Sequence, residues 1–562
     1  MLFRKQKRFD AMNREKENTE LRSQDIISFF DDSTIFLTGV TGFLGQVLLS
    51  KLLTSCSGIR KIFILIREKK NKGINERFKE IFDALIFDKI KSEYPHYLDK
   101  VIPIKGDCLK PILGLSKTDR LILEKEVNVI FHVAATIRFN ASLKEAVNIN
   151  VRSTRDLLNI AKNMTMLQAF VYVSTVFSSC VGRTILEEKL YEPPIQANNL
   201  ISWIDLLNDD ATIIDRITSG LLDQYPNTYI FTKATAENLF DSVCSELPVS
   251  IFRPAIVIST AKEPIPGWIN NGRSIPVVFL TALFKGLLKT VLIDKTKKAD
   301  IVPADYVING LISSAWYTAQ RWKILKNDPA KFEVIKGREI PIFNFSSSET
   351  KNCITWRQFV NENLAMESEL PSSSSLRILS TSSVMFLMAE KYVVYSIILF
   401  KMLSDVGLTL NVLYVSSSND DWITFLGIYL SVRVIWACSA ILNKYEFVHR
   451  IYVFLLHLIP AFVVDTVAIL RGKKPKMWQL YQKMHKMNEL FLYFLIRNWS
   501  SPSNNVKELW NNLGERDKQI FNFNLNNLKW NEYFGDYVMG LRLYVVKDDL
   551  DTLSYAKKKR KM

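Results

Sequence analysis

The sequence has few of the residues that mark stapled, metal-bound or low-complexity proteins. Its 562 residues include 6 cysteines, 5 histidines, 20 glycines and 18 prolines. The cysteines are scattered without a Cys-x-x-Cys pair, which excludes a disulfide scaffold and indicates free thiols in a reducing compartment. The histidines form no pair at metal-ligand spacing, so we expect no metal site. No apolar segment follows the first methionine, and the sequence therefore predicts no secretory signal peptide.

Positive charge is in excess, and apolar residues are plentiful. Lys and Arg number 73 against 57 Asp and Glu, a net charge of +16, and 48% of the residues are hydrophobic. This composition supports a large core and argues against disorder as the main state. The charge favours an acidic partner, such as a phosphate-rich cofactor or substrate or an anionic lipid. Basic and aromatic residues do not interleave on a recognised module, so we expect no nucleic-acid partner.

The character of the sequence changes along the chain, which predicts four parts. A Ser-rich joint at residues 371–375 marks the main boundary, because the sequence after it is strongly apolar. The predicted parts are a basic tail at 1–30, an α/β domain at 31–370, an apolar region at 376–470 and a polar helical region at 471–562.

Three apolar runs follow the joint, at residues 392–415, 422–442 and 452–470. About 20 apolar residues are needed to cross the hydrocarbon core of a bilayer. We expect at least one run to span or embed in a membrane. The alternative is a buried helical core or a monotopic hairpin.

A glycine-rich turn follows the first predicted strand, residues 34–38, and precedes a helix pattern at residues 46–53. Glycines let the backbone approach phosphate groups, and the free N–H groups of a helix start bind anions. The spacing Gly-x-x-Gly-x-x-Gly in this context predicts a dinucleotide pyrophosphate site. The expected residues of the site are Thr38, Gly39, Thr41, Gly42, Phe43, Leu44 and Gly45.

Further cofactor contacts are expected where the next strands end. Arg67 follows the strand at residues 61–66, and an Arg at this place suits the 2′-phosphate of NADP. The alternative is a solvated charge at a strand end, and Glu68 is its neighbour. Asp107 and Ala134 end later strands and should face the same crevice. We interpret His132 as a packed strand residue.

The chemical groups follow in a second cluster. Residues 170–175 form a strand pattern that ends in Ser174 and Thr175, and a later helix pattern carries Tyr229 and Lys233. A spacing of four places these two side chains on one helix face. We expect the ammonium group to lower the phenol pKa, and a hydroxyl to hydrogen-bond a substrate carbonyl.

Residues 33–310 resemble an extended short-chain dehydrogenase/reductase, and more narrowly the alcohol-forming fatty acyl-CoA reductases. The narrower resemblance continues into the carboxyl-terminal domain peculiar to that family. It is carried by residues 38–45, 135–139, 170–175, 229–233, 253–254, 263–269, 300–305, 457–461, 465 and 472–475. Two departures are an altered turn after Trp268 and a longer, more hydrophobic stretch at residues 376–450.

The resemblance implies a Rossmann-type doubly wound parallel sheet, followed by an apolar membrane-associated helical region and a small helical C-terminal domain. It implies reduction of a long-chain acyl-CoA by two NADPH to a primary alcohol through a bound aldehyde, with Tyr229 as proton donor and Lys233 as its partner. One alternative is another membrane-bound reductase of the hydroxysteroid dehydrogenase type. A second is a catalytically silent membrane scaffold that binds NADPH.

We expect the chain on the endoplasmic reticulum membrane with its catalytic domain in the cytosol, where NADPH and acyl-CoA are found. The basic residues 471–476 belong on that side, and Lys559 with Arg560 faintly resembles a retrieval signal. A peroxisomal Ser-Lys-Leu signal is absent. The run 452–470 is expected not to span, because it carries His457, Pro460 and Asp465.

Overall fold

The computed structural model describes residues 24–69, 71–207, 211–270, 274–327, 340–372 and 440–561. Most of the predicted basic tail lies outside the described residues. So do the whole apolar run 392–415 and the run 422–442 up to residue 439.

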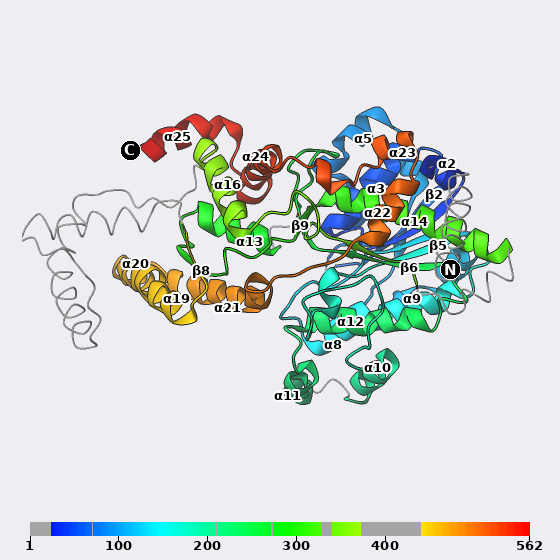
Figure 1. The fold of residues 1–562 in the computed structure, drawn as a ribbon, viewed down its shortest axis with the longest axis horizontal. Coiled ribbons are helices and arrows are strands. Elements are labelled where there is room, and N and C mark those ends of the chain that lie inside the picture. The colour runs from blue at the N-terminus through cyan, green and yellow to red at the C-terminus, as the bar shows by residue number, and fades with distance from the viewer. Residues whose placement is uncertain are drawn as a thin grey trace, which may run out of the picture.

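Seven parallel strands form the central sheet (Figure 1). Their order is β10-β6-β5-β4-β1-β2-β3, and every neighbouring pair is parallel. Chain order therefore reverses between β1 and β4, which confirms the predicted doubly wound sheet. The strands are β1 Thr34–Thr38, β2 Lys61–Ile66, β3 Val101–Lys105, β4 Val129–His132, β5 Ala169–Val173, β6 Val249–Pro254 and β10 Ile342–Phe345.

Each face of the sheet has its own apolar core, because side chains alternate along a strand. On one face Ile35 and Leu37 pack with α3, Phe43–Ser55, and α14, Ala304–Asn327. On the other face Phe36 and Phe170 pack with α9, Ser153–Ala161, and α12, Thr228–Asp241. Both faces of the strands are thus covered, as the continuous apolar strand sequences require.

The other helices of residues 31–370 complete this part of the chain. They are α4 Ile74–Phe82, α5 Asp88–Glu93, α6 Tyr97–Lys100, α7 Lys117–Glu126, α8 Leu143–Val147, α10 Ala197–Leu206, α11 Ala211–Leu222, α13 Ile275–Phe284 and α16 Trp356–Glu369.

The basic tail ends earlier than predicted. Residues 26–30, which the prediction included in it, form helix α2, Ile26–Phe30. Asp25 caps this helix by accepting the N–H of Ser28, and Ile26 and Phe30 are fully buried. Apolar burial therefore ties the end of the predicted tail into the core.

The C-terminal helices do not form a core of their own. Tyr533, Phe534 and Tyr537 belong to the same apolar cluster as α3 and α14. The Tyr533 hydroxyl also donates to the Ser259 carbonyl at 3.0 Å. The predicted C-terminal helical region is thus packed onto the reductase-like body. Its helices are α21 Met477–Leu495, α22 Asn504–Asn512, α23 Glu515–Ile520, α24 Trp530–Gly540 and α25 Leu553–Lys561.

Between these parts lies one long apolar helix, Glu446–Leu470. It comprises α19, Glu446–Val453, a π-helical turn at Phe454–Leu458, and α20, Ile459–Leu470. Among the described residues this is the one helix long and apolar enough to cross a membrane. The short strand β11, Ile441–Asn443, precedes it and pairs with β8, Thr290–Leu292. Residues 441 and 442, predicted as the end of an apolar run, therefore lie in a strand.

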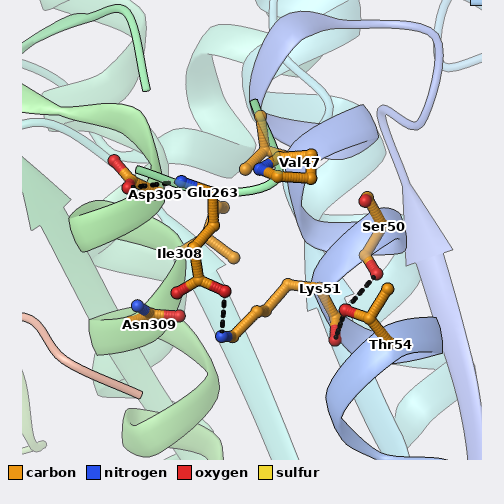
Figure 2. Close-up of a pocket in the computed structure, with 9 residues that line it drawn as sticks. Val47, Ser50, Lys51, Thr54, Glu263, Asp305, Ile308 and Asn309 are labelled. Carbon is orange, nitrogen blue, oxygen red and sulfur yellow. Dashed lines mark hydrogen bonds and ion pairs between the residues drawn. The ribbon is translucent and has the colours of Figure 1, made fainter. Parts of the chain in front are cut away.

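The loop at residues 261–264 is anchored beside α3. Figure 2 shows a small pocket there, lined by residues of α3, of α14 and of the loop. The Asp305 carboxylate accepts the backbone N–H groups of Ala261, Lys262 and Glu263 at 2.7–3.1 Å. Glu263 in turn pairs with Lys51 Nζ at 2.6 Å. One buried carboxylate therefore fixes the start of this loop.

We predict that Asp305→Ala lowers the free energy of unfolding by about 2–4 kcal/mol, because three backbone N–H donors, one of them buried, lose their charged acceptor. Urea unfolding of the two proteins measures the change. Asp305→Asn keeps the side-chain volume and one acceptor oxygen, so its loss should be smaller. Equal unfolding midpoints for Asp305→Ala and the parent chain would contradict this role.

Candidate functional site

The turn between β1 and α3 is packed backbone against backbone. Gly39 has a φ of +81°, and a Cβ added there would lie 2.7 Å from the Ala134 nitrogen. A Cβ on Gly45 would lie 2.2 Å from the Gly39 carbonyl oxygen. Only glycine fits either position. Gly42 is the N-cap of α3 and has no side chain to occupy the free N–H groups of the first turn. The turn therefore offers an anion the open helix start that the sequence predicted.

A buried hydrogen-bond chain supports this turn from below. The Thr38 hydroxyl oxygen accepts the Ala134 N–H at 3.2 Å and lies 2.8 Å from His132 Nδ1. His132 Nε2 lies 3.1 Å from the Thr154 hydroxyl. Burial lowers the pKa of His132 to about 3, so the ring is neutral and both nitrogens are engaged. This confirms His132 as a packed strand residue, one that holds β4 against the turn.

Arg67 and Asp107 meet at the same edge of the sheet. They follow β2 and β3, and the Arg67 guanidinium lies 3.8 Å from the Asp107 carboxylate. The Arg67 side chain is half exposed, so it can reach a ligand at the strand ends. Glu68, the acidic neighbour, is paired instead with Lys105 Nζ at 2.7 Å. The carboxyl ends of β1, β2, β3 and β4 thus gather the predicted cofactor residues.

Tyr229 and Thr175 lie together at the neighbouring strand end. Thr175 is buried and Tyr229 is half-buried, and Tyr229 stands in the first turn of α12, which Asn227 caps. Burial raises the pKa of Tyr229, while a hydrogen bond from Thr175 partly offsets this. The phenol therefore holds its proton at neutral pH.

Lys233 lies one turn further along α12 but does not touch the phenol. Its Nζ donates to the Val173 carbonyl at 2.6 Å and to the Tyr172 hydroxyl at 3.2 Å. Burial lowers the pKa of Lys233 to about 7. The prediction that Lys233 lowers the pKa of Tyr229 is not met, because desolvation dominates both groups and the ammonium is directed at β5.

A further hydroxyl, that of Ser174, lies at the carboxyl end of β5. Ser174 is almost fully buried, and its Oγ has no hydrogen-bond partner among the described residues. A buried hydroxyl without a partner is costly and points to a ligand atom that completes it. Together with the open helix start and the glycine contacts, this supports a nicotinamide dinucleotide along the strand ends.

The sequence analysis missed the buried ion pair between Glu237 and Arg253. Arg253 donates to Glu237 at 2.9 and 2.6 Å, and the Ser178 hydroxyl donates to the same carboxylate at 2.9 Å. Glu237 follows Lys233 by four residues, so its charge raises the pKa of Lys233 in part against burial. A continued spacing of four after Tyr229 and Lys233 is the signal that could have identified it.

Aromatic side chains of the C-terminal helix α21 also reach the site. The Phe139 ring stacks on Tyr229 with centroids 5.8 Å apart. Phe491 and Phe494 of α21 lie 4.9 and 6.0 Å from Phe139. No pattern in the local sequence links residues so distant in the chain. The site is therefore closed on one side by the C-terminal helices.

In the described part of the chain, no group of three His, Cys, Asp or Glu side chains is arranged to hold an ion. The pocket of Figure 2 is separate from this site, because none of its nine lining residues is a predicted catalytic or cofactor residue.

Two family models match the chain. Both are described as male sterility protein, and they cover residues 37–311 and 456–548. Among curated proteins, the chain is 32% identical to fatty acyl-CoA reductase wat of Drosophila melanogaster over 93% of this chain and 86% of that protein. It is 31% identical to fatty acyl-CoA reductase 1 of Mus musculus over 95% of this chain and 88% of that protein. The human reductase 1 is 30% identical, with the same coverage.

Solved structures give weaker likenesses. The terminal R domain of the myxalamid PKS-NRPS pathway has a TM-score of 0.43 at 22% identity, covering 60% of this chain and 70% of that one. The PhqB reductase domain of Penicillium fellutanum has a TM-score of 0.40 at 16% identity, covering 78% and 98%.

Proposed function

Because the chain belongs to the fatty acyl-CoA reductase family, we propose that it reduces a long-chain acyl-CoA to a primary alcohol with NADPH, releasing CoA. The observation that carries the proposal is the cluster of a protonated phenol, Tyr229, and the buried hydroxyls of Thr175 and Ser174 beside the glycine turn.

The glycine turn and the start of α3 would hold the cofactor pyrophosphate, with Arg67 at the 2′-phosphate and Asp107 and Ala134 along the strand ends. When bound, the cofactor supplies a hydride to the substrate carbonyl carbon, first of the thioester and then of the aldehyde. The hydroxyls of Ser174 and Thr175 donate to the carbonyl oxygen as negative charge develops on it. Collapse of the first adduct breaks the carbon–sulfur bond and expels the CoA thiolate.

Tyr229 then gives its proton to the alkoxide oxygen of the reduced aldehyde. Its raised pKa suits a proton donor. Lys233 carries a proton close by, and its pKa of about 7 lets it gain or lose that proton near neutrality. Glu237 and Arg253 hold the helix that presents both groups.

The two alternatives fit less well. A hydroxysteroid dehydrogenase type would lack the C-terminal region, whereas a family model matches residues 456–548. A silent scaffold has no need for an unpartnered buried hydroxyl beside a phenol at one strand end, since such a hydroxyl is costly to keep.

The proposal extends to location. We place the chain on an endoplasmic reticulum membrane with its catalytic part in the cytosol, where acyl-CoA and NADPH are found. The long apolar helix Glu446–Leu470 and the basic residues after it support this placement.

We predict that Tyr229→Phe lowers kcat about 10²–10⁴-fold, because the ring still packs on Phe139 while the proton donor is gone. NADPH binding, measured by fluorescence titration, should not change. Tyr97→Phe makes the same chemical change far from the site, at a ring packed on Phe82, and should keep full turnover. Near-normal turnover by Tyr229→Phe would remove this residue from the mechanism.

We predict that Arg67→Ala lowers the ratio of kcat/KM for NADPH over NADH about 10- to 100-fold, because a charge-assisted contact to phosphate contributes about 1.5–3 kcal/mol. Arg60→Ala, just before the amino end of the same strand, is the matched control. An unchanged ratio in Arg67→Ala would shift the 2′-phosphate contact to Lys69.

A further inference from the structure

The long helix Glu446–Leu470 carries an exposed apolar stripe. Phe447, Phe462 and Leu470 are 72%, 66% and 81% exposed, and Ile451 and Phe454 lie between them on the same side. A soluble surface rarely leaves large apolar side chains in such a row. The stripe is therefore suited to contact with an apolar partner.

Three polar residues of this helix, His449, His457 and Asp465, face the protein, whereas Glu446, Arg450 and Thr466 are exposed. His449 Nδ1 lies 3.1 Å from the Thr290 hydroxyl, and His457 Nε2 accepts the Lys289 N–H at 2.9 Å. The Asp465 carboxylate accepts three N–H groups at the start of α21, each at 2.9 Å. The extra residue of the π-helical turn keeps His449 and His457 on one face although they are eight apart. The large side chains on the opposite face are apolar.

The helix Glu446–Leu470 packs against α21, which carries charged residues. Asp465 joins α20 to α21, so the two helices form a hairpin that projects from the body with the turn 471–476 at its tip (Figure 1). Lys483 and Lys486 of α21 are exposed. If the helix crossed a bilayer, α21 and the turn 471–476 would have to enter the bilayer with it. Each Lys or Arg that reaches the centre of the bilayer costs about 2.5–3.5 kcal/mol of insertion free energy.

The tip itself is strongly basic. Arg471, Lys473, Lys474 and Lys476 are all exposed, and residues 471–476 include no acid. Each well-placed Lys or Arg contributes about 1 kcal/mol toward an anionic leaflet. Apolar stripe and basic tip together complement a phospholipid surface with anionic headgroups.

We propose that Glu446–Leu470 lies in the plane of an anionic phospholipid surface, with its outward stripe among the acyl chains and the tip 471–476 among the headgroups. An interfacial helix buries its apolar face about 5–10 Å deep. The proposal rests on the proposed membrane association and specifies its geometry. It places lipid at the amino end of α21. At the carboxyl end of the same helix, Phe491 and Phe494 contact Phe139, which stacks on Tyr229.

The first test is photolabelling of the full chain bound to vesicles of phosphatidylcholine and phosphatidylserine that contain a phosphatidylcholine with a diazirine in its acyl chain. We expect label on peptides from Glu446–Leu470, at Phe447, Phe454 and Phe462. The matched control peptide is α10, whose Trp203 and Leu206 are also exposed and should stay unlabelled. If the chain's own apolar residues 392–439 cover the stripe, the helix will escape the label, and the proposal fails.

The second test asks on which side the tip lies. In sealed vesicles with the reductase part outside, Lys473→Cys should react with an impermeant maleimide as fast as Lys125→Cys on α7, both corrected for the parent chain. Protection of Lys473→Cys alone would show that the helix crosses, which overturns the in-plane geometry.

The third test measures how much the positive charge of the tip contributes to vesicle binding. Lys473→Glu with Lys474→Glu should weaken binding to phosphatidylserine vesicles in flotation by at least about 30-fold, since two favourable contacts are lost. Lys117→Glu with Lys125→Glu is the control of equal charge and should bind normally. Equal binding of both pairs overturns the role of the tip. A parent chain that does not float with vesicles would instead contradict membrane association itself.

Discussion

The buried ammonium of Lys233 organises the active part of the molecule. Its side chain is 1% exposed, and its Nζ is satisfied by the Val173 carbonyl and the Tyr172 hydroxyl. An unpaired charge could not remain there, so Glu237 lies one turn away and is itself held by Arg253 from β6. These contacts lock α12 against β5 and β6. Tyr229, one turn earlier on the same face, is thereby fixed beside Thr175.

Local patterns predicted the glycine turn and the helix that follows it well. A strand, glycines at fixed spacing and a helix start are adjacent in sequence, and the structure keeps them adjacent in space. The contacts of Gly39 with Ala134 and of Gly45 with Gly39 then show why glycine is needed there. Parallel strands end at one edge, which made the meeting of Arg67 and Asp107 foreseeable.

Contacts between distant parts of the chain were not foreseeable. Phe139 contacts both Tyr229 and the C-terminal Phe491, which lie about 90 and about 350 positions further along the chain, and no periodicity encodes these contacts. The direction of the Lys233 ammonium was also beyond the sequence, because a spacing of four places two side chains on one face without making them touch. His457 and Asp465 looked like obstacles to membrane insertion. In the structure they turn inward and leave the outer face of their helix apolar.

The central claim is a two-step reduction at one site, with CoA as the leaving group. Its most direct test counts products from the purified chain supplied with a long-chain acyl-CoA and NADPH. The account predicts a primary alcohol, with two NADPH oxidised for each CoA thiol released. Aldehyde as the final product with one NADPH oxidised per thiol, or oxidation without thiol release, would contradict it.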